Sequence, residues 1–350
     1  MTRVMFRDLR KNSCWLALVS LTVSVWVSKG VAQELIPEFT EYGHPNLQGF
    51  WTNPFQTPLE RPAALGNKRV YSSSEAETLR ERAIAIDRKR RAPLDPHRSA
   101  PELGGQLNNQ ADGNFEVMPV ELAQISGEFR TSLIVEPNSG RIPWRAGGKD
   151  IHQQRREQGK GRFDGPEGMT PLDRCLTPGG QLPLIYMFGG VETALGNPAG
   201  DNPVRNIQIV QNKSYVVILS EYFSLVRIIR IDSEFEPELG RKWMGDSIGY
   251  YEGNSLIVYT KNFRQEQSIT PLRSSAEFQV KEVYTKIDEN EILFQYTISD
   301  PNIYTEQWTV EIPIQRMETE LKLYEYACHE GNYSLPIMLR AARMEEAGVL

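Results

Sequence analysis

Histidine and cysteine are scarce in this chain, and their scarcity excludes several kinds of chemistry. The sequence holds four histidines and three cysteines, and no two cysteines form a CxxC pair. It also contains no glycine-rich phosphate loop, no dinucleotide-binding fingerprint and no EF-hand loop. Nucleotide and redox cofactors are therefore unsupported, and we expect the protein to work without a cofactor.

A zinc site lacks the histidines that it would need. His329-Glu330 resembles the start of the H-E-x-x-H motif, but Tyr333 stands where the second histidine ligand belongs. A site of three histidines would have to draw on the long loops for its other ligands. The other histidines are His44, His97 and His152. We therefore predict no metal site and expect His329 and Glu330 to hydrogen-bond the backbone around Cys328.

The apolar run near the N-terminus is too short to cross a membrane. It extends over the 13 residues 15–27, whereas a membrane-spanning helix needs about 20. Basic residues precede this run, and the small residues Gly30-Val31-Ala32 follow it. Residues 1–32 are therefore predicted to be a cleaved secretory signal, with an uncleaved anchor as the alternative. The prediction places the protein in the periplasm or outside the cell.

Basic residues are fewer than acidic residues. The chain has 39 Lys and Arg against 45 Asp and Glu, a net charge of −6. Removing residues 1–32 takes away five basic residues and one acidic residue, so the charge becomes −6 − 4 = −10. A surface this acidic repels phosphate backbones, and we predict no nucleic-acid partner.

Two cysteines, Cys175 and Cys328, remain after the signal is removed together with Cys14. An even pair in an exported chain predicts a disulfide, and two buried free thiols are the alternative. The bridge would stabilise the fold by about 3–5 kcal/mol, because it closes a long loop in the unfolded chain.

The first third of the chain is predicted to hold one helix between long loops. Ser74 and Glu77 fit a capping box at its start, and apolar residues follow at helical spacing. Residues 93–114 and 147–183 are rich in residues typical of loops. A second, short surface helix is expected over residues 336–348.

The sequence from residue 206 onward predicts β-structure almost throughout. Apolar and polar residues alternate in the candidate strands, as in half-buried strands. The candidate strands are 130–135, 206–210, 215–221, 225–231, 255–260, 278–287, 291–299, 307–314 and 321–326. Short connections favour an antiparallel meander, which closes into a lipocalin-like barrel or folds into a sandwich. We expect one mainly β domain over residues 33–350, with the helix and loops inserted at about 72–190.

Four sequence blocks together resemble a large set of exported bacterial proteins. The blocks are PxLxGxW at 45–51, RCL at 174–176, GDSxGxxEG at 245–253 and EYACHEGNY at 325–333. One position departs from the pattern, since Tyr251 stands where tryptophan is usual. The resemblance implies an exported, β-rich protein and no particular activity. Separately, the Gly-x-Trp of residues 49–51 resembles the opening strand of lipocalins, whose tryptophan plugs the barrel floor.

A serine-hydrolase motif is present, but its surroundings are unsuitable. Residues 245–249 fit G-x-S-x-G around Ser247, and Asp300 and His329 follow in the order of an α/β-hydrolase triad. That motif requires a helix directly after the serine, whereas residues 255–260 read as a strand. We therefore prefer a glycine-rich hairpin in which Asp246 and Ser247 cap the turn.

The leading functional hypothesis is an exported protein that binds an apolar or aromatic small molecule. The ligand-binding candidates are Trp51, Arg174, Trp308 and Tyr326. The first alternative is a hydrolase, lyase or isomerase; its catalytic candidates are His329, Glu330, Asp246 and Ser247. The second alternative is an interaction protein of the cell envelope, whose partner proteins are unknown. Glu221 and Arg227 flank Tyr222 and Phe223 and are secondary candidates, with a surface ion pair as their alternative.

Overall fold

A computed structural model shows a mainly β protein with a closed barrel, and two α-helices lie within the residues that it describes. The structure describes residues 38–90, 96–97, 99, 120–150, 161, 163–171, 173–177, 206–236, 240–264, 273–318 and 323–349. The predicted signal at residues 1–32 lies outside this part of the chain. The predicted mainly β fold is confirmed, and of its two forms the barrel is correct.

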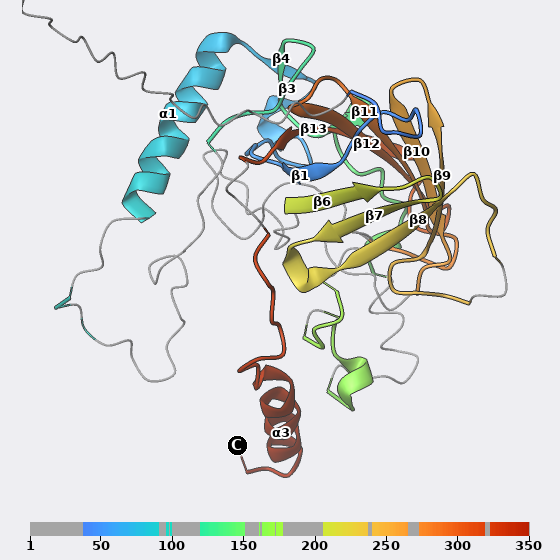
Figure 1. Cartoon of the computed structure of the whole chain (residues 1–350). Helices are drawn as coiled ribbons and strands as arrows, with labels where there is room; N and C mark the ends of the chain where they lie inside the picture. The colour runs from blue at the N-terminus through green and yellow to red at the C-terminus, as the bar shows by residue number, and fades with distance from the viewer. Residues whose placement is uncertain are drawn as a thin grey trace, which may run out of the picture. The chain divides into compact units, whose positions relative to one another are not determined.

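Nine strands form the barrel (Figure 1). They follow one another in the order β1-β6-β7-β8-β9-β10-β11-β12-β13, and β13 pairs with β1 to close the sheet. A tenth strand, β5 (Ile134–Glu136), pairs with the start of β13. The barrel strands are β1 (Gly49–Thr52), β6 (Asn206–Gln211), β7 (Tyr215–Ser220), β8 (Val226–Ile231), β9 (Asp246–Glu252), β10 (Ser255–Lys261), β11 (Gln279–Lys286), β12 (Glu291–Ser299) and β13 (Trp308–Arg316).

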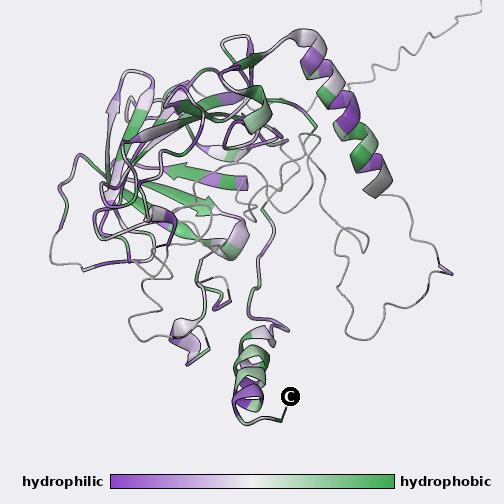
Figure 2. Ribbon diagram, turned by 180° about the vertical axis from the view of Figure 1, so that it is seen from behind, coloured by the Kyte–Doolittle hydropathy of each residue, from purple (hydrophilic) through white to green (hydrophobic). Residues whose placement is uncertain are grey.

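Alternation of residue type explains why these segments form a barrel. Along β12 every second side chain is buried, and the same alternation runs through most of β13. These inward residues join one hydrophobic core, and hydrophobic residues colour the strands green in Figure 2. Burying each such side chain stabilises the fold by about 1.5–3 kcal/mol. The inward residues of β12 are Ile292, Phe294, Tyr296 and Ile298.

One strand pair departs from the expected antiparallel meander. β8 and β9 are parallel, with Ile229 opposite Ser247 and Ile231 opposite Gly249. The chain that joins β8 to β9 must therefore return to the end of the barrel at which β8 began. Asp246 and Ser247, which we expected to cap the turn of a hairpin, instead begin strand β9. The prediction failed because glycines at 245, 249 and 253 are typical of turns, whereas Gly249 lies inside a strand.

Gly249 is required by close packing. A Cβ atom at this position would lie 2.9 Å from the backbone oxygen of Ile257 and 3.1 Å from the Ile229 side chain. Without a side chain, β9 can pack closely between β8 and β10. The glycine that suggested a turn therefore permits the parallel strand pair.

Trp51 and Arg316 lie where the barrel closes. Trp51 is fully buried, and its indole N–H donates to the Leu47 oxygen at 2.8 Å. The Arg316 guanidinium lies over the Trp51 ring, 4.2 Å from the ring centroid. A Cβ atom on Gly49 would stand 2.2 Å from Arg316 Nη1, and the φ of Gly49 is +133°. In the Gly-x-Trp pattern, the glycine thus leaves room for the Arg316 guanidinium, which covers the tryptophan ring.

The same end of the barrel is covered by the chain before β1. Gln211 accepts a hydrogen bond from the Leu47 backbone and donates to the Pro45 oxygen and to Tyr251. Lys286 donates to the Glu38 oxygen at 2.9 Å. Residues 38–48 therefore close this end, which also carries the tight turns at 212–214, 253–254 and 287–290.

An ion pair is buried inside the barrel. Arg227 and Glu282 are 2% and 0% exposed, and two of their N–O distances are 2.8 and 3.0 Å. Tyr284 donates to the same carboxylate at 2.9 Å. Burial lowers the pKa of Arg227, but the charge and hydrogen bonds of Glu282 outweigh it, so the pKa is raised overall. The alternative of a surface pair between Arg227 and Glu221 is therefore wrong.

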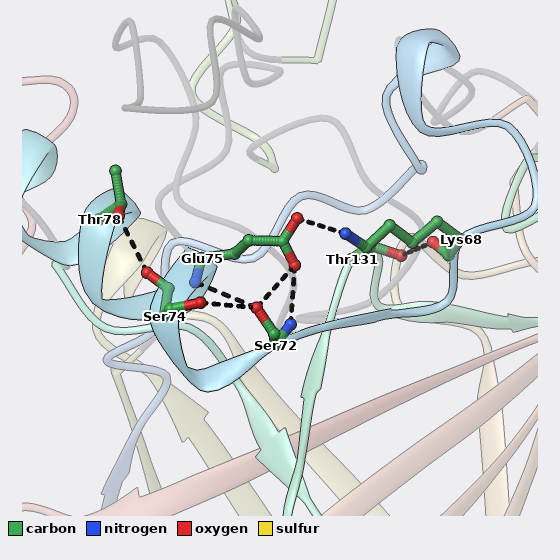
Figure 3. A network of polar contacts seen from close by, with 6 residues as sticks. All are labelled: Lys68, Ser72, Ser74, Glu75, Thr78 and Thr131. Carbon is green, nitrogen blue, oxygen red and sulfur yellow. Dashed lines mark hydrogen bonds and ion pairs between the residues drawn. The ribbon is translucent and has the colours of Figure 1, made fainter.

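The predicted first helix is present, but its capping box lies two residues earlier than expected. α1 spans Ser73–Arg90. Ser72 accepts from the Glu75 N–H, and the Glu75 carboxylate accepts from the Ser72 N–H and from Lys68 (Figure 3). These contacts lower the pKa of Glu75 to about 2, with the Lys68 hydrogen bond as the largest cause. Ser72-x-x-Glu75 fits the same motif as Ser74-x-x-Glu77, so the sequence pattern alone was ambiguous.

A small sheet and a C-terminal helix are present in addition to the barrel and α1. β2 (Val70–Tyr71), β4 (Glu128–Arg130) and β3 (Gln124–Ile125) form a small separate sheet. The strand expected at 130–135 is divided between β4 and β5. The strand expected at 321–326 is wrong for its described residues, 323–326, which belong to no strand. The predicted tail helix is confirmed as α3 (Ser334–Glu346).

Candidate ligand site at the rim of the barrel

The end of the barrel opposite residues 38–48 carries the longer connections. β7 and β8 are joined there by the 3-10 turn η4 (Tyr222–Ser224). Because most neighbouring strands are antiparallel, the β10–β11 and β12–β13 connections lie at this end too. We call it the η4 end. It brings together residues that are far apart in the sequence.

Three aromatic rings form a cluster on η4, which we call the rim platform: Tyr222, Phe223 and Tyr326. The rings of Phe223 and Tyr326 are stacked, with centroids 4.9 Å apart and an interplanar angle of 19°. Tyr222 meets Tyr326 edge-on at 4.7 Å and Phe223 edge-on at 4.8 Å. All three residues are half-buried, so the platform keeps part of its surface open to solvent.

The backbone beneath the platform is strained. Phe223 and Ser224 have φ values of 64° and 48°, in the left-handed region that bulky residues rarely adopt. Such strain persists where surrounding contacts hold the residues in place, and it is frequent at functional sites. Here the Ser220 hydroxyl donates to the Tyr222 oxygen, and the Ser224 N–H donates to the Glu221 oxygen. The turn therefore holds its aromatic side chains in one arrangement.

Glu221 fixes the chain that brings Tyr326 to the platform. One carboxylate oxygen accepts from the Tyr324 N–H at 2.9 Å, and the other accepts from Asn206 at 3.0 Å. Both oxygens are thus occupied by neutral donors. Glu221 therefore positions residues 324–326. The groups that the platform exposes to solvent are its aromatic rings.

The predicted disulfide is present and ties two loops to this end. Cys175 and Cys328 are bonded, with Cα atoms 5.7 Å apart. The Asn332 amide also donates to the Cys175 sulfur at 3.2 Å. The bridge holds Arg174 and Tyr326, two of the predicted ligand-binding residues, in the same region.

Arg174 lies against a tryptophan that the sequence did not single out. Its guanidinium carbon is 5.7 Å from the ring centroid of Trp243, and that of Arg264 is 4.9 Å from the same ring. We call these three residues the Trp243 cluster. Backbone hydrogen bonds hold Arg264 beside the tryptophan, since its N–H donates to the Lys242 oxygen.

Two other predicted ligand-binding residues, Trp51 and Trp308, lie in the core. Both are 0% exposed. Trp51 is covered by Arg316 at the end closed by residues 38–48, and Trp308 packs edge-on against Tyr296 and Tyr304. The structure therefore does not bring these two residues to the rim platform.

The candidate catalytic residues are divided between two places. Asp246 and Ser247 begin strand β9; Arg230 pairs with Asp246 at 2.7 Å, and Ser247 shares a hydrogen bond with Thr260 at 2.9 Å. A strand, β10, follows rather than the helix that a serine-hydrolase motif needs. His329 and Glu330 have exposed side chains in a turn after the disulfide. The geometry offers no support for a shared catalytic centre of these four residues.

A hollow outside the barrel is a second candidate site. It has a volume of about 530 Å³ and lies between α3 and residues 164–166. Its lining is mostly apolar, and Arg343 in its wall donates to the backbone oxygens of Phe163 and Asp164. Binding sites combine apolar surface with a few convergent polar groups. Arg343 already binds the backbone of residues 163–164, so it is not free to bind a ligand. The hollow is therefore a weaker candidate for a ligand site than the rim platform.

Comparison with known proteins adds no family. No protein-family model matches the chain, and no curated protein matches it with significant similarity. Within the described residues, no helix is long and apolar enough to cross a membrane, and no group of three or more His, Cys, Asp or Glu side chains could hold a metal ion. Any function must therefore be inferred from the residues at the rim of the barrel.

The sequence could indicate only part of this site. Arg174 and Tyr326 were found because each lies near a cysteine of the predicted bridge. Tyr222 and Phe223 were noted only as neighbours of Glu221, and Trp243 was missed. No pattern in the sequence shows that residues 222–223, 243 and 326 lie at the same end of a barrel.

Proposed function

We propose that the protein is an exported binding protein that holds a small, planar apolar molecule on the rim platform. The observation that carries the proposal is the half-exposed cluster of Tyr222, Phe223 and Tyr326 on a strained turn. Stacked and edge-on aromatic contacts contribute about 0.5–1.5 kcal/mol each beyond the area that they bury. A planar ligand would add such contacts without any change of backbone.

Rigidity supports the same proposal. The disulfide and the hydrogen bonds of Glu221 hold the platform, so little conformational entropy remains to be lost on binding. The barrel below supplies a packed base, because its interior is filled by side chains of the hydrophobic core. Binding at the rim therefore needs no opening of the barrel.

A fluorescence titration tests the proposal. N-phenyl-1-naphthylamine, a neutral probe with a planar naphthalene ring, emits more strongly in apolar surroundings and should bind the mature protein with micromolar affinity. Phe223→Ala and Tyr326→Ala should each weaken binding by about 3- to 10-fold, the loss expected for one aromatic contact. Tyr259→Ala removes an exposed tyrosine on the outer face of β10 and should leave the affinity unchanged. Equal affinity in all four proteins would refute binding at the platform.

A further inference from the structure

The outer face of β6, β7 and β8 carries a patch of apolar side chains, which we call the apolar wall. Side chains alternate along each of the three strands, and most of those that point away from the core are apolar. Four of them are between 44% and 55% exposed. The wall consists of Val210, Tyr215, Val217, Leu219, Val226 and Ile228, of which Val217 and Leu219 are half-buried.

The register of the strands makes the wall continuous. Val217 lies opposite Val210 on one side and opposite Ile228 on the other, and Leu219 lies opposite Val226. Opposite residues on one face of a sheet have Cβ atoms about 4.5–5.5 Å apart, so these side chains form one surface. Figure 1 shows the three strands side by side on the barrel. Single exposed apolar residues are ordinary, whereas a contiguous patch marks a surface that binds a partner.

The size of the wall suits the centre of a protein interface. With four residues about half exposed, the wall presents on the order of 400 Å² of apolar surface, whereas each partner in a standard interface buries about 800 Å² in all. Such an interface has an apolar centre and a polar rim. Gln208 and Arg230, which point outward on the same strands, supply polar groups at the border of the wall. The outer face of a barrel is convex, whereas small-molecule sites are concave clefts.

The charge of the wall favours a second copy of this chain as the partner. The mature chain has a predicted net charge of −10, so two copies repel each other where their acidic surfaces meet. Among the outward residues of β6, β7 and β8, the only charged side chain is Arg230, and Asp246 pairs with it at 2.7 Å. The wall is therefore a neutral face at which two acidic molecules can meet. A lipid surface favours apolar residues flanked by several Lys or Arg, which these strands do not supply.

We infer that two copies of the protein associate through their apolar walls to form a symmetric dimer. β6, β7 and β8 are each paired on both sides, so the copies must stack their sheet faces and cannot add strands to each other. Stacked sheet faces lie about 10 Å apart, with their side chains interdigitated. A two-fold axis through the wall places Val226 and Ile228 of each copy against the wall of the other. The inference uses no residue of the rim platform and is independent of the proposed function.

Sedimentation velocity of the mature protein tests the inference. Between about 1 and 100 µM, the protein should change from monomer to dimer, with a dissociation constant in the micromolar range. Raising the NaCl concentration from about 50 to 500 mM should strengthen the dimer, because salt screens the repulsion between two acidic molecules. A dimer that weakens with salt would be held by ion pairs and would contradict an apolar interface.

A lysine placed in the wall should separate the two copies. Ile228→Lys and Val226→Lys should each raise the dissociation constant of the dimer at least about 100-fold, because the interface would bury unpaired charges of the same sign. Ile287→Lys is the matched control, and it should leave the dissociation constant unchanged. Ile287 is 52% exposed, close to the 55% of Ile228, but it follows β11, which is three strands away from β8 in the sheet.

Thermal unfolding checks that each variant is folded, and Val226→Lys keeps the test decisive if Ile228→Lys does not fold. Monomeric lysine variants beside a dimeric Ile287→Lys would support the inference. A wild-type protein that stays monomeric at the highest concentration would overturn it, as would a dimer that persists unchanged in both wall variants. Binding of a wild-type monomer to phosphatidylglycerol vesicles, lost in Ile228→Lys, would assign the wall to a lipid surface instead.

Discussion

Replacing one member of the buried ion pair should destabilise the protein more than replacing both. Arg227→Met leaves the Glu282 carboxylate inside the barrel with Tyr284 as its remaining polar partner. Arg227→Met with Glu282→Leu leaves no charge behind and fills the space with apolar atoms. The comparison therefore separates the cost of an unpaired charge from the cost of losing an ion pair.

The magnitude follows from burial and geometry. Both residues are at most 2% exposed, and the closest N–O distance is 2.8 Å, so solvent cannot compensate the charge that remains. Breaking a buried pair of this kind costs about 3–5 kcal/mol, whereas replacing both members by apolar residues is often neutral or stabilising. We expect Arg227→Met to lose about 3–5 kcal/mol and the double variant to lose less than about 1 kcal/mol.

Urea unfolding followed by tryptophan fluorescence measures the difference. The slope of the transition should stay constant across the variants, so that a shift of the midpoint reports stability. Arg80→Met is a matched control, because the ion pairs of Arg80 with Glu77 and Glu121 are exposed; it should cost less than about 1 kcal/mol. If the single and double variants are equally unstable, the loss of stability comes from losing the ion pair and not from leaving a charge unpaired. That result would refute the prediction.

Three further predictions concern closure, pH and the first helix. Gly49→Ala should destabilise by about 1–3 kcal/mol, because a φ of +133° strains any residue with a Cβ and because that Cβ would stand 2.2 Å from Arg316 Nη1; in Arg316→Ala only the cost of the clash should disappear in urea unfolding. Burial raises the pKa of Asp246, but Arg230 lowers it more, so the net shift is downward. Its stabilisation is complete above the pKa of an unfolded aspartate, about 3.9, and is lost as the pH falls below that value; thermal unfolding at pH 7 and pH 3 should show a smaller change for Asp246→Asn than for wild type. Ser72→Ala should weaken the start of α1 by about 1 kcal/mol, visible as faster amide hydrogen exchange there, whereas normal exchange would contradict the capping box at Ser72.

The sequence predicted the barrel strands well where one face is buried. β12 was predicted over its full length, because its apolar and polar residues alternate without interruption. β9 was missed, since Gly249 breaks that alternation for a reason that only packing reveals. The parallel pairing of β8 with β9 likewise depends on where residues 232–245 run, which local sequence does not encode.

The candidate site was less predictable than the fold. The disulfide followed from counting cysteines in a chain expected to be exported, and the structure confirms it. Trp51 and Trp308 were chosen as ligand residues because aromatic side chains suit both cores and binding sites, and here both are buried in the core. The ring contacts of Phe223 with Tyr326 join residues more than 100 positions apart. Only the three-dimensional arrangement shows them.

A crystal structure with N-phenyl-1-naphthylamine bound tests the central claim most directly. We expect the aromatic rings of the ligand to lie against Tyr222, Phe223 and Tyr326. A ligand found in the hollow between α3 and residues 164–166, with the rim platform bare, would contradict it.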